Sequence, residues 1–164
     1  MNLRNYTLED IILTALKSEI DSKNFYTKLS KQVENFLLKE RLLFLANEEG
    51  KHQNFFETLY GENFPDKSIV LPKKNVVPLP ELKIESDLIP ISKVLQSAMD
   101  AEKSAHDFYL SFSERYENKP DIKNMLLYIA SMELGHYRLL EIEKENAEKF
   151  EGYNIDFPLM HIGP

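Results

Sequence analysis

The chain has 164 residues, of which 43% are hydrophobic, and a formal net charge of −7. This length is sufficient for one compact domain with a sizeable core. A nucleic-acid partner is not expected because it requires clustered basic residues, and the sequence has neither a membrane-spanning apolar run nor a signal-peptide pattern. The absence of cysteine excludes disulfides, cysteine-bound zinc and iron–sulfur clusters. We therefore expect a cytoplasmic protein without a membrane partner.

The hydrophobic pattern predicts an all-α chain with four helices, at about 7–33, 36–60, 91–116 and 120–150. Thr7 is expected to cap the first helix, with Asp10 three residues further on. Gly61 is expected to end the second helix in a left-handed conformation, and Gly152 to close the fourth. Together the helices form a single domain over residues 1–164.

Two segments lie outside the predicted helices. Residues 61–90 contain five of the eight prolines and little helical periodicity, which predicts a long crossover of the kind found in some four-helix bundles. Residues 151–164 form a tail that is too apolar for a free end, so we expect it to pack against the bundle or a second subunit. The sequence leaves open the role of His161 in this tail.

Two segments read Glu-x-x-His, and each follows a lone glutamate at nearly the same distance. The six residues are Glu19, Glu49 and His52 in the first half, and Glu102, Glu133 and His136 in the second. Residues three apart share one face of a helix. Two single glutamates plus two Glu-x-x-His pairs are the ligand set of a two-metal carboxylate site in a four-helix bundle.

The surroundings of these residues also repeat. Shifting the first predicted helix by 83 residues places Tyr26 on Tyr109, and shifting the second by 84 places His52 on His136. The repeating unit is therefore one helical hairpin used twice. The turn-forming residues of each hairpin lie midway between its two glutamates, about 22 Å along the helix from each. All four glutamates are expected to lie in one layer.

The predicted ligands suit two divalent ions. Four carboxylates neutralise the charge of two such ions, and mixed carboxylate and imidazole ligands favour iron, with manganese as an alternative. Two-metal sites typically hold their ions about 3.5–4 Å apart.

With these residues the sequence resembles the rubrerythrin branch of the ferritin-like di-iron proteins. The resemblance implies a four-helix bundle of two antiparallel hairpins with a long crossover between helices 2 and 3. It also implies a non-haem di-iron oxidoreductase that reduces hydrogen peroxide or dioxygen in oxidative-stress defence. By this resemblance, Glu19 and Glu102 would be terminal ligands or would change their binding mode with the redox state. Glu49 and Glu133 would bridge the irons, and His52 and His136 would bind one iron each.

The resemblance also implies residues around the ligands. Tyr26 and Tyr109 would donate hydrogen bonds to the site. Glu48 would accept a hydrogen bond from His136, whereas Met132 cannot do the same for His52, so the two iron positions would be inequivalent.

Two departures from the family pattern affect the functional interpretation. Ala105 occupies the position of a further glutamate that rubrerythrins usually carry, which weakens the peroxidase interpretation. The four-cysteine rubredoxin module is absent, so electrons would come from an external rubredoxin-like protein or flavoprotein. Gly50 replaces the haem-ligating methionine of bacterioferritins, so no haem is expected. We also expect a homodimer.

Two other functions remain open on the sequence alone. The chain could be a ferritin-like protein that oxidises and handles iron, or a regulatory or scaffolding bundle that the metal stabilises. The fold by itself does not decide between an enzyme and these alternatives.

Overall fold

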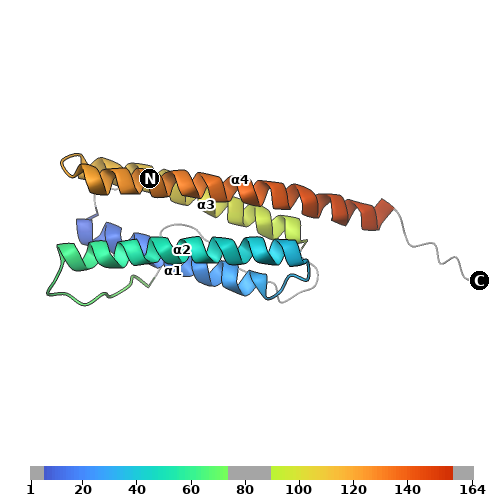
Figure 1. Ribbon diagram of the computed structural model, residues 1–164, viewed down its shortest axis with the longest axis horizontal. Coiled ribbons are helices and arrows are strands. Elements are labelled where there is room, and N and C mark those ends of the chain that lie inside the picture. Colours follow the sequence, from blue (N-terminus) through green and yellow to red (C-terminus); the bar gives the residue numbers. More distant parts are fainter. Residues whose placement is uncertain (1–5, 74–89, 157–164) are drawn as a thin grey trace, which may run out of the picture.

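The computed structural model describes residues 6–73 and 90–156, which form four long helices joined into a bundle (Figure 1). The helices are α1 (Leu8–Ser30), α2 (Phe36–Asn63), α3 (Ile91–Ser113) and α4 (Pro120–Asp156), with a short 3₁₀ helix, η2 (Glu114–Tyr116), after α3. These two ranges contain no strand, and the predicted all-α bundle is confirmed. Within the same ranges, no helix is both long enough and apolar enough to cross a bilayer.

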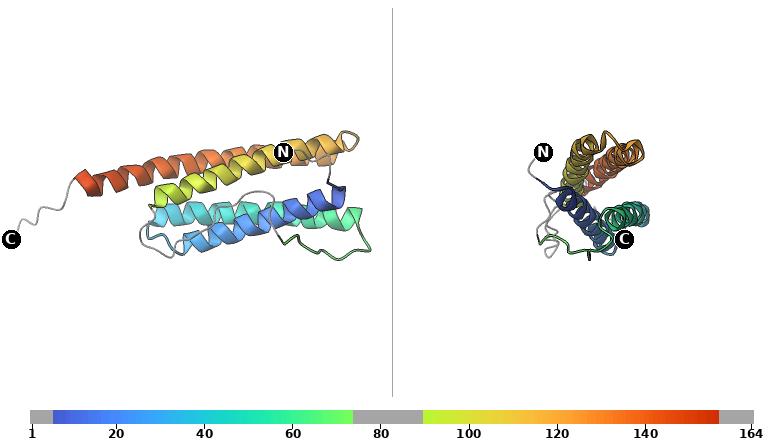
Figure 2. Two further views of the ribbon diagram at one scale, coloured as in Figure 1. Left: turned by 180° about the vertical axis from the view of Figure 1, so that it is seen from behind. Right: turned by 90° about the vertical axis from the view of Figure 1, so that its left-hand side faces the viewer.

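The bundle consists of two helical hairpins. α1 pairs with α2, and α3 pairs with α4, and the end-on view shows the two pairs as two layers (Figure 2). α2 ends and α3 begins at opposite ends of the bundle. Most of the predicted crossover, residues 74–89, lies outside the described residues.

Polar side chains cap the starts of α1, α2 and α3. The caps of α1 and α2 come from residues next to the helix start, and that of α3 comes from another helix. Thr7 and Asp10 form the predicted capping box, with Thr7 N donating to Asp10 Oδ2 at 3.0 Å and Asp10 N to Thr7 Oγ1 at 3.1 Å. Asn35 caps α2 in the same local way. α3 has no cap of its own, and Glu151 of α4 accepts from Ser92 N at 3.1 Å and from Ser92 Oγ at 2.6 Å.

Two helices run past the glycines that were expected to end them. α2 continues through Gly61 to Asn63, because the Tyr60 carbonyl accepts the Phe64 amide at 2.8 Å and no described glycine has positive φ. α4 continues through Gly152 to Asp156, so the first six residues of the predicted tail are helical. The rest of that tail, with His161, lies outside the described residues.

The core has two parts, one on each side of the predicted ligand layer. Core A contains Ile11, Ile12, Ala15, Leu16, Phe56, Leu59, Tyr60, Ala105, Phe108, Tyr109, Phe112, Tyr116, Leu126, Ile129 and Ala130. Core B contains Phe25, Tyr26, Leu29, Leu38, Leu42, Leu45, Ala46, Val94, Leu95, Ala98, Met99, Leu140 and Ala147. On every helix the predicted ligands fall between the residues of core A and those of core B.

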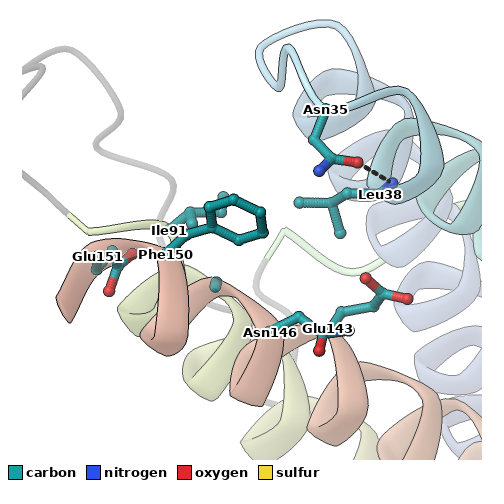
Figure 3. Close-up of a pocket in the computed structure, with 8 residues that line it drawn as sticks. Asn35, Leu38, Ile91, Glu143, Asn146, Phe150 and Glu151 are labelled. Carbon is teal, nitrogen blue, oxygen red and sulfur yellow. Dashed lines mark hydrogen bonds between the residues drawn. The ribbon is translucent and has the colours of Figure 1, made fainter. Parts of the chain in front are cut away.

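α4 is the longest helix and extends past its neighbours at the core B end (Figure 1). A cavity of about 290 Å³ lies beneath this extension. Leu38 of α2 faces Phe150 of α4 across it, and Ile91 of α3 also lines it (Figure 3). The core B end is therefore incompletely filled.

Candidate metal centre

The six predicted ligands meet in the middle of the bundle and are all buried. Their exposed fractions lie between 1% and 4%, for Glu19, Glu49, His52, Glu102, Glu133 and His136. Each Glu-x-x-His presents both side chains from one helix face, and the single glutamates come from α1 and α3. Carboxylates are almost never this buried without paired positive charge.

The ligand atoms form two overlapping groups. One group contains Glu19, Glu49, His52 and Glu133, and the other contains Glu49, Glu102, Glu133 and His136. Within each group the ligand atoms lie within 4.8 Å of one another. Glu49 and Glu133 belong to both groups, whereas Glu19 and Glu102 belong to one each. Two adjacent ions could therefore share two carboxylates.

The imidazole rings turn the same nitrogen toward the carboxylates. His52 Nδ1 lies 3.2 Å from Glu19 Oε2 and 3.1 Å from Glu133 Oε1. His136 Nδ1 lies 3.1 Å from Glu49 Oε1 and 3.4 Å from Glu133 Oε2. The two rings are nearly parallel, at 22°, with centroids 5.9 Å apart. The arrangement is thus close to symmetric about the two shared glutamates.

Two buried tyrosines donate hydrogen bonds to the outer glutamates, as predicted. The hydroxyl of Tyr26 donates to Glu102 Oε1, and that of Tyr109 donates to Glu19 Oε1. Each bond crosses from one hairpin to the other, which the sequence did not predict. Seven residues span about 10 Å along a helix, so neither hydroxyl meets the glutamate of its own helix. Side chains on a helix slant toward its N-terminus. Each tyrosine therefore points back toward the glutamate layer, where it meets the glutamate of the other helix, Tyr26 of α1 with Glu102 of α3 and Tyr109 of α3 with Glu19 of α1.

The carboxylates need neighbouring positive charge or protons. Burial, with the charge of Glu49, raises the pKa of Glu19 and of Glu102 well above the ordinary value. Burial on its own would lower the pKa of His52, but the carboxylates of Glu133, Glu19 and Glu49 outweigh it and raise that pKa to about 12. A pair of cations would supply the same compensation.

Several buried atoms of these residues make no hydrogen bond, although three of the pairs described above bring them within 3.1–3.4 Å of an oppositely charged group. They are Oε1 of Glu49, Oε1 of Glu133, Nε2 of His52, and both ring nitrogens of His136. An unpaired buried polar atom costs free energy, so these clustered orphans indicate a missing partner. Carboxylate oxygens and imidazole nitrogens are suitable donors for iron or manganese, and the residues present therefore fit a two-metal centre.

One predicted interaction is not formed. Glu48 is buried, but it is bound by Lys51 of the same helix, and Nε2 of His136 has no hydrogen-bond partner. Lys51 lies one turn further on, so it reaches Glu48 without any tertiary contact. The predicted inequivalence of the two positions through Glu48 thus has no counterpart in this structure. Ala105 packs into core A and brings no carboxylate to the site.

The sequence analysis missed a difference in packing behind the two tyrosines. The Tyr109 ring stacks on Phe56, with centroids 5.4 Å apart. The equivalent of Phe56 in the repeat is Leu140, which lies in core B with Tyr26. The shift of 84 residues aligns Phe56 with Leu140, so the signal was present in the sequence.

Comparison with known proteins agrees with the fold. The family model named Rubrerythrin matches residues 10–89 and 93–158. A hypothetical protein from Pyrococcus furiosus has a similar structure, with a TM-score of 0.80 and 31% sequence identity. The match covers 91% of this chain and 95% of that one. A search of curated proteins finds no match.

Proposed function

The chain belongs to the rubrerythrin family, and from this premise we propose that it is a non-haem di-iron oxidoreductase that reduces hydrogen peroxide or dioxygen. The observation that carries the proposal is the pair of overlapping ligand groups that share Glu49 and Glu133. Mononuclear sites do not need shared carboxylates. When bound, two adjacent iron ions supply the electrons that reduce an O–O bond, and manganese is the alternative metal.

The protein's own residues would hold and insulate this centre. Glu49 and Glu133 would bridge the ions, Glu19 and Glu102 would bind one ion each, and His52 and His136 would complete the set. The four carboxylates balance the charge of two divalent ions, so the loaded site carries no net charge in the core. Burial of all six residues excludes water, which limits side reactions of a reactive oxidant.

Tyr26 and Tyr109 would fix the outer carboxylates. Each hydroxyl donates to one oxygen of Glu102 or Glu19 and leaves the other oxygen for metal. Since Ala105 supplies no further carboxylate, the proposed reaction depends on the six ligands alone. The chain has no cysteine for a rubredoxin-type centre. We therefore include an external electron donor in the proposal. The proposal also keeps the homodimer and the cytoplasmic location expected from the sequence.

Metal counting and rapid kinetics test the proposal. The protein is loaded anaerobically with ferrous iron and mixed with hydrogen peroxide or with dioxygen in a stopped-flow instrument. We expect two irons per chain, rapid oxidation by at least one of the two oxidants, and repeated turnover when a reductase and donor are added.

Matched variants sharpen this test. Glu133→Gln removes a shared ligand and should abolish both loading and reaction. Glu48→Gln changes a buried carboxylate that belongs to neither ligand group, and it should leave both intact. Far more than two irons per chain in a large assembly would instead indicate iron storage. A single slow oxidation without turnover, with a large stability loss on chelation, would indicate a metal-stabilised scaffold.

A further inference from the structure

Apolar side chains from three helices line the cavity beneath the extension of α4. They belong to Leu38, Ile91, Ala147 and Phe150, and the volume is about 290 Å³. An engineered cavity of about 150 Å³ lined by Leu, Ile and Phe binds benzene, so this cavity has room for about two side chains of that size. Phe150, which faces Leu38 across the cavity (Figure 3), is 69% exposed. The residues that the structure describes therefore leave the cavity open and unfilled.

The two acidic side chains of the cavity already have partners. Glu143 Oε1 lies 3.7 Å from Arg41 Nε of α2, and Glu151 accepts two hydrogen bonds from Ser92 of α3. Both contacts join α4 to a neighbouring helix, so they fix the position of α4 over the cavity. The apolar groups of the cavity still lack contacts, and an apolar occupant would supply them.

The residues that follow α4 have the composition of such an occupant. Residues 157–164 include four apolar side chains, those of Phe157, Leu159, Met160 and Ile162. The same segment contains no Asp, Glu, Lys or Arg. Pro158 disfavours a helical conformation at the residue before it, which agrees with the end of α4 at Asp156. The chain is therefore free to change direction directly after the helix.

The chain leaves α4 on the side of the cavity. Residue 157 follows Phe150 by seven residues, which is about two turns, so both positions lie on one face of the helix. That face lines the cavity. Proline is favoured at the second position of a reverse turn, and Pro158 would hold this position in a turn that begins at residue 157.

The reach of the segment matches the position of the cavity. Phe150 and Ala147 lie about 10 and 15 Å back along the helix axis from residue 157. An extended chain that returns from residue 157 covers about 10 Å by Met160 and about 17 Å by Ile162. These two residues are two apart, so in extended backbone they point to the same side.

We propose that residues 157–164 fold back along α4 and that Met160 and Ile162 fill the cavity of their own chain. Leu159, which alternates with them, then faces away from it. The sequence left open whether this segment packs against the bundle or a second subunit, and its reach favours the bundle. The docking does not depend on the proposed function, because none of the six predicted ligands lines the cavity.

The crossover before α3 is a less suitable occupant. It leads into Ile91, but it carries Glu85 and Asp87 within six residues of that position. These carboxylates would approach Glu143 and Glu151 of the cavity, and like charges at short range repel. Residues 157–164 bring no acidic side chain to the same place.

Disulfide formation between introduced cysteines tests the docking, because the chain has no cysteine of its own. Ala147→Cys combined with Ile162→Cys should form a disulfide within one chain in oxidised glutathione, since this bond needs Cα atoms about 4.4–6.8 Å apart. Ala147→Cys combined with Leu159→Cys is the matched control and should stay mostly reduced. Non-reducing electrophoresis and peptide mass spectrometry separate a bond within one chain from a bond between two chains.

Three results would overturn the proposal. An Ala147–Ile162 disulfide between two chains would show that a second copy supplies the segment. A disulfide in the variant with Ala147→Cys and Leu88→Cys, in place of the one at Ile162, would assign the cavity to the crossover. An Ala147–Ile162 pair that stays reduced would show that the segment does not reach the cavity.

Substitutions without cysteine test the same contacts independently. Met160→Ser and Ile162→Ser each remove an apolar side chain from the cavity, so each should lower the midpoint of urea unfolding by about 0.5–1 M. Leu159→Ser removes a side chain of similar size that faces away, and it should leave the midpoint unchanged. Unchanged midpoints in both cavity variants, or an equal loss in Leu159→Ser, would contradict the proposed docking.

Discussion

The two ends of the bundle are built from the same hairpin repeat but filled with different side chains. Core A contains six aromatic residues, namely Phe56, Tyr60, Phe108, Tyr109, Phe112 and Tyr116. Core B contains two, Phe25 and Tyr26. These two are the counterparts of Phe108 and Tyr109. The repeat is thus retained next to the ligands and lost further from them.

This difference separates the part of the core that contacts the buried Glu and His cluster from the part that does not. Tyr26 and Tyr109 both bond to a ligand glutamate, so changing either would alter the site directly. Phe56 and its counterpart Leu140 have no hydrogen-bonding side chain, so each core can hold the apolar residue that fits its own space. A core tolerates such exchange if its volume and apolar character are preserved.

The ends also differ in how they are closed. At the core A end, Phe64 and Leu71, which follow α2, pack against the core. The Tyr60 hydroxyl donates to Glu9 Oε1 at 3.0 Å and to the Ser68 carbonyl at 3.3 Å. At the core B end, α4 extends over a cavity and Phe150 is 69% exposed. One end is covered by its own chain, whereas the described residues leave the other open.

The largest expected effect is the loss of metal binding when a glutamate shared by the two ligand groups is removed. Glu133→Ala removes a ligand of both groups, whereas Glu19→Ala and Glu102→Ala each remove a ligand of one. We expect Glu133→Ala to bind less than one ion per chain. The other two variants should each lose affinity at one position, by more than the roughly 10–100-fold typical of residues that only orient ligands.

Metal analysis and isothermal titration of iron-free protein measure these losses, and circular dichroism checks that the helices remain. Equal losses in Glu19→Ala and Glu102→Ala would show that the two halves bind equivalently. Two ions retained by Glu133→Ala would contradict the shared-ligand geometry.

A smaller effect tests whether the two cores are independent. Leu140→Phe adds bulk to core B and should destabilise the protein by about 1–3 kcal/mol through overpacking. Phe56→Leu removes bulk from core A and should cost a similar amount through the cavity it leaves. The two sites lie on opposite sides of the ligand layer and share no partner. The double variant should therefore show the sum of the two effects, within about 0.5 kcal/mol.

Urea unfolding of the metal-free single and double variants provides the measurement. If the double variant loses markedly less free energy of unfolding than the two single variants lose together, the ligand layer transmits packing changes between the cores.

The clustering of the six Glu and His side chains and the paired hairpins could be predicted from the sequence because both follow from helix periodicity. Three-residue spacing places Glu49 with His52, and Glu133 with His136, whatever the tertiary structure. The internal repeat then implies that the two pairs meet at the same height. Local capping was equally predictable, since Thr7 and Asp10 are three residues apart.

What the sequence did not predict has two sources, a contact between helices and competition among local partners. The cap of α3 comes from Glu151, which lies 59 residues from Ser92 in the sequence. The end of α2 passed Gly61 because Tyr60 is buried and its carbonyl is satisfied by Phe64. Glu48 was assigned to His136, but a lysine on its own helix pairs with it. Spacing along the chain does not predict the contact between Ser92 and Glu151. The contacts of Glu48 and Tyr60 are local, and the sequence offered each group more than one possible partner.

The smallest expected effect concerns the covered end. The Lys67 ammonium donates to Glu9 Oε2 at 2.6 Å, and with the Tyr60 hydroxyl it lowers the pKa of Glu9 below its ordinary value of 4.5. A lowered pKa stabilises the folded state above pH 4.5, and this contribution is lost as the pH falls through the lowered value. The pKa of Lys67 is raised above 10.5 by the same contact, so its contribution is lost only at strongly alkaline pH.

Lys67→Ala should therefore be slightly less stable than the parent protein at neutral pH, and this difference in stability should narrow as the pH falls below 4.5. Both groups are near the surface, so salt should also narrow the gap. Lys144→Ala is the control. Lys144 also forms an ion pair with a glutamate, but its partner, Glu148, lies one turn away on the same helix, so this pair joins no separate segments. Urea unfolding at pH 7 and pH 3.5 compares the two variants. A Lys67→Ala gap that persists unchanged at pH 3.5 would mean that the segment after α2 is held by its apolar contacts alone, through Phe64 and Leu71.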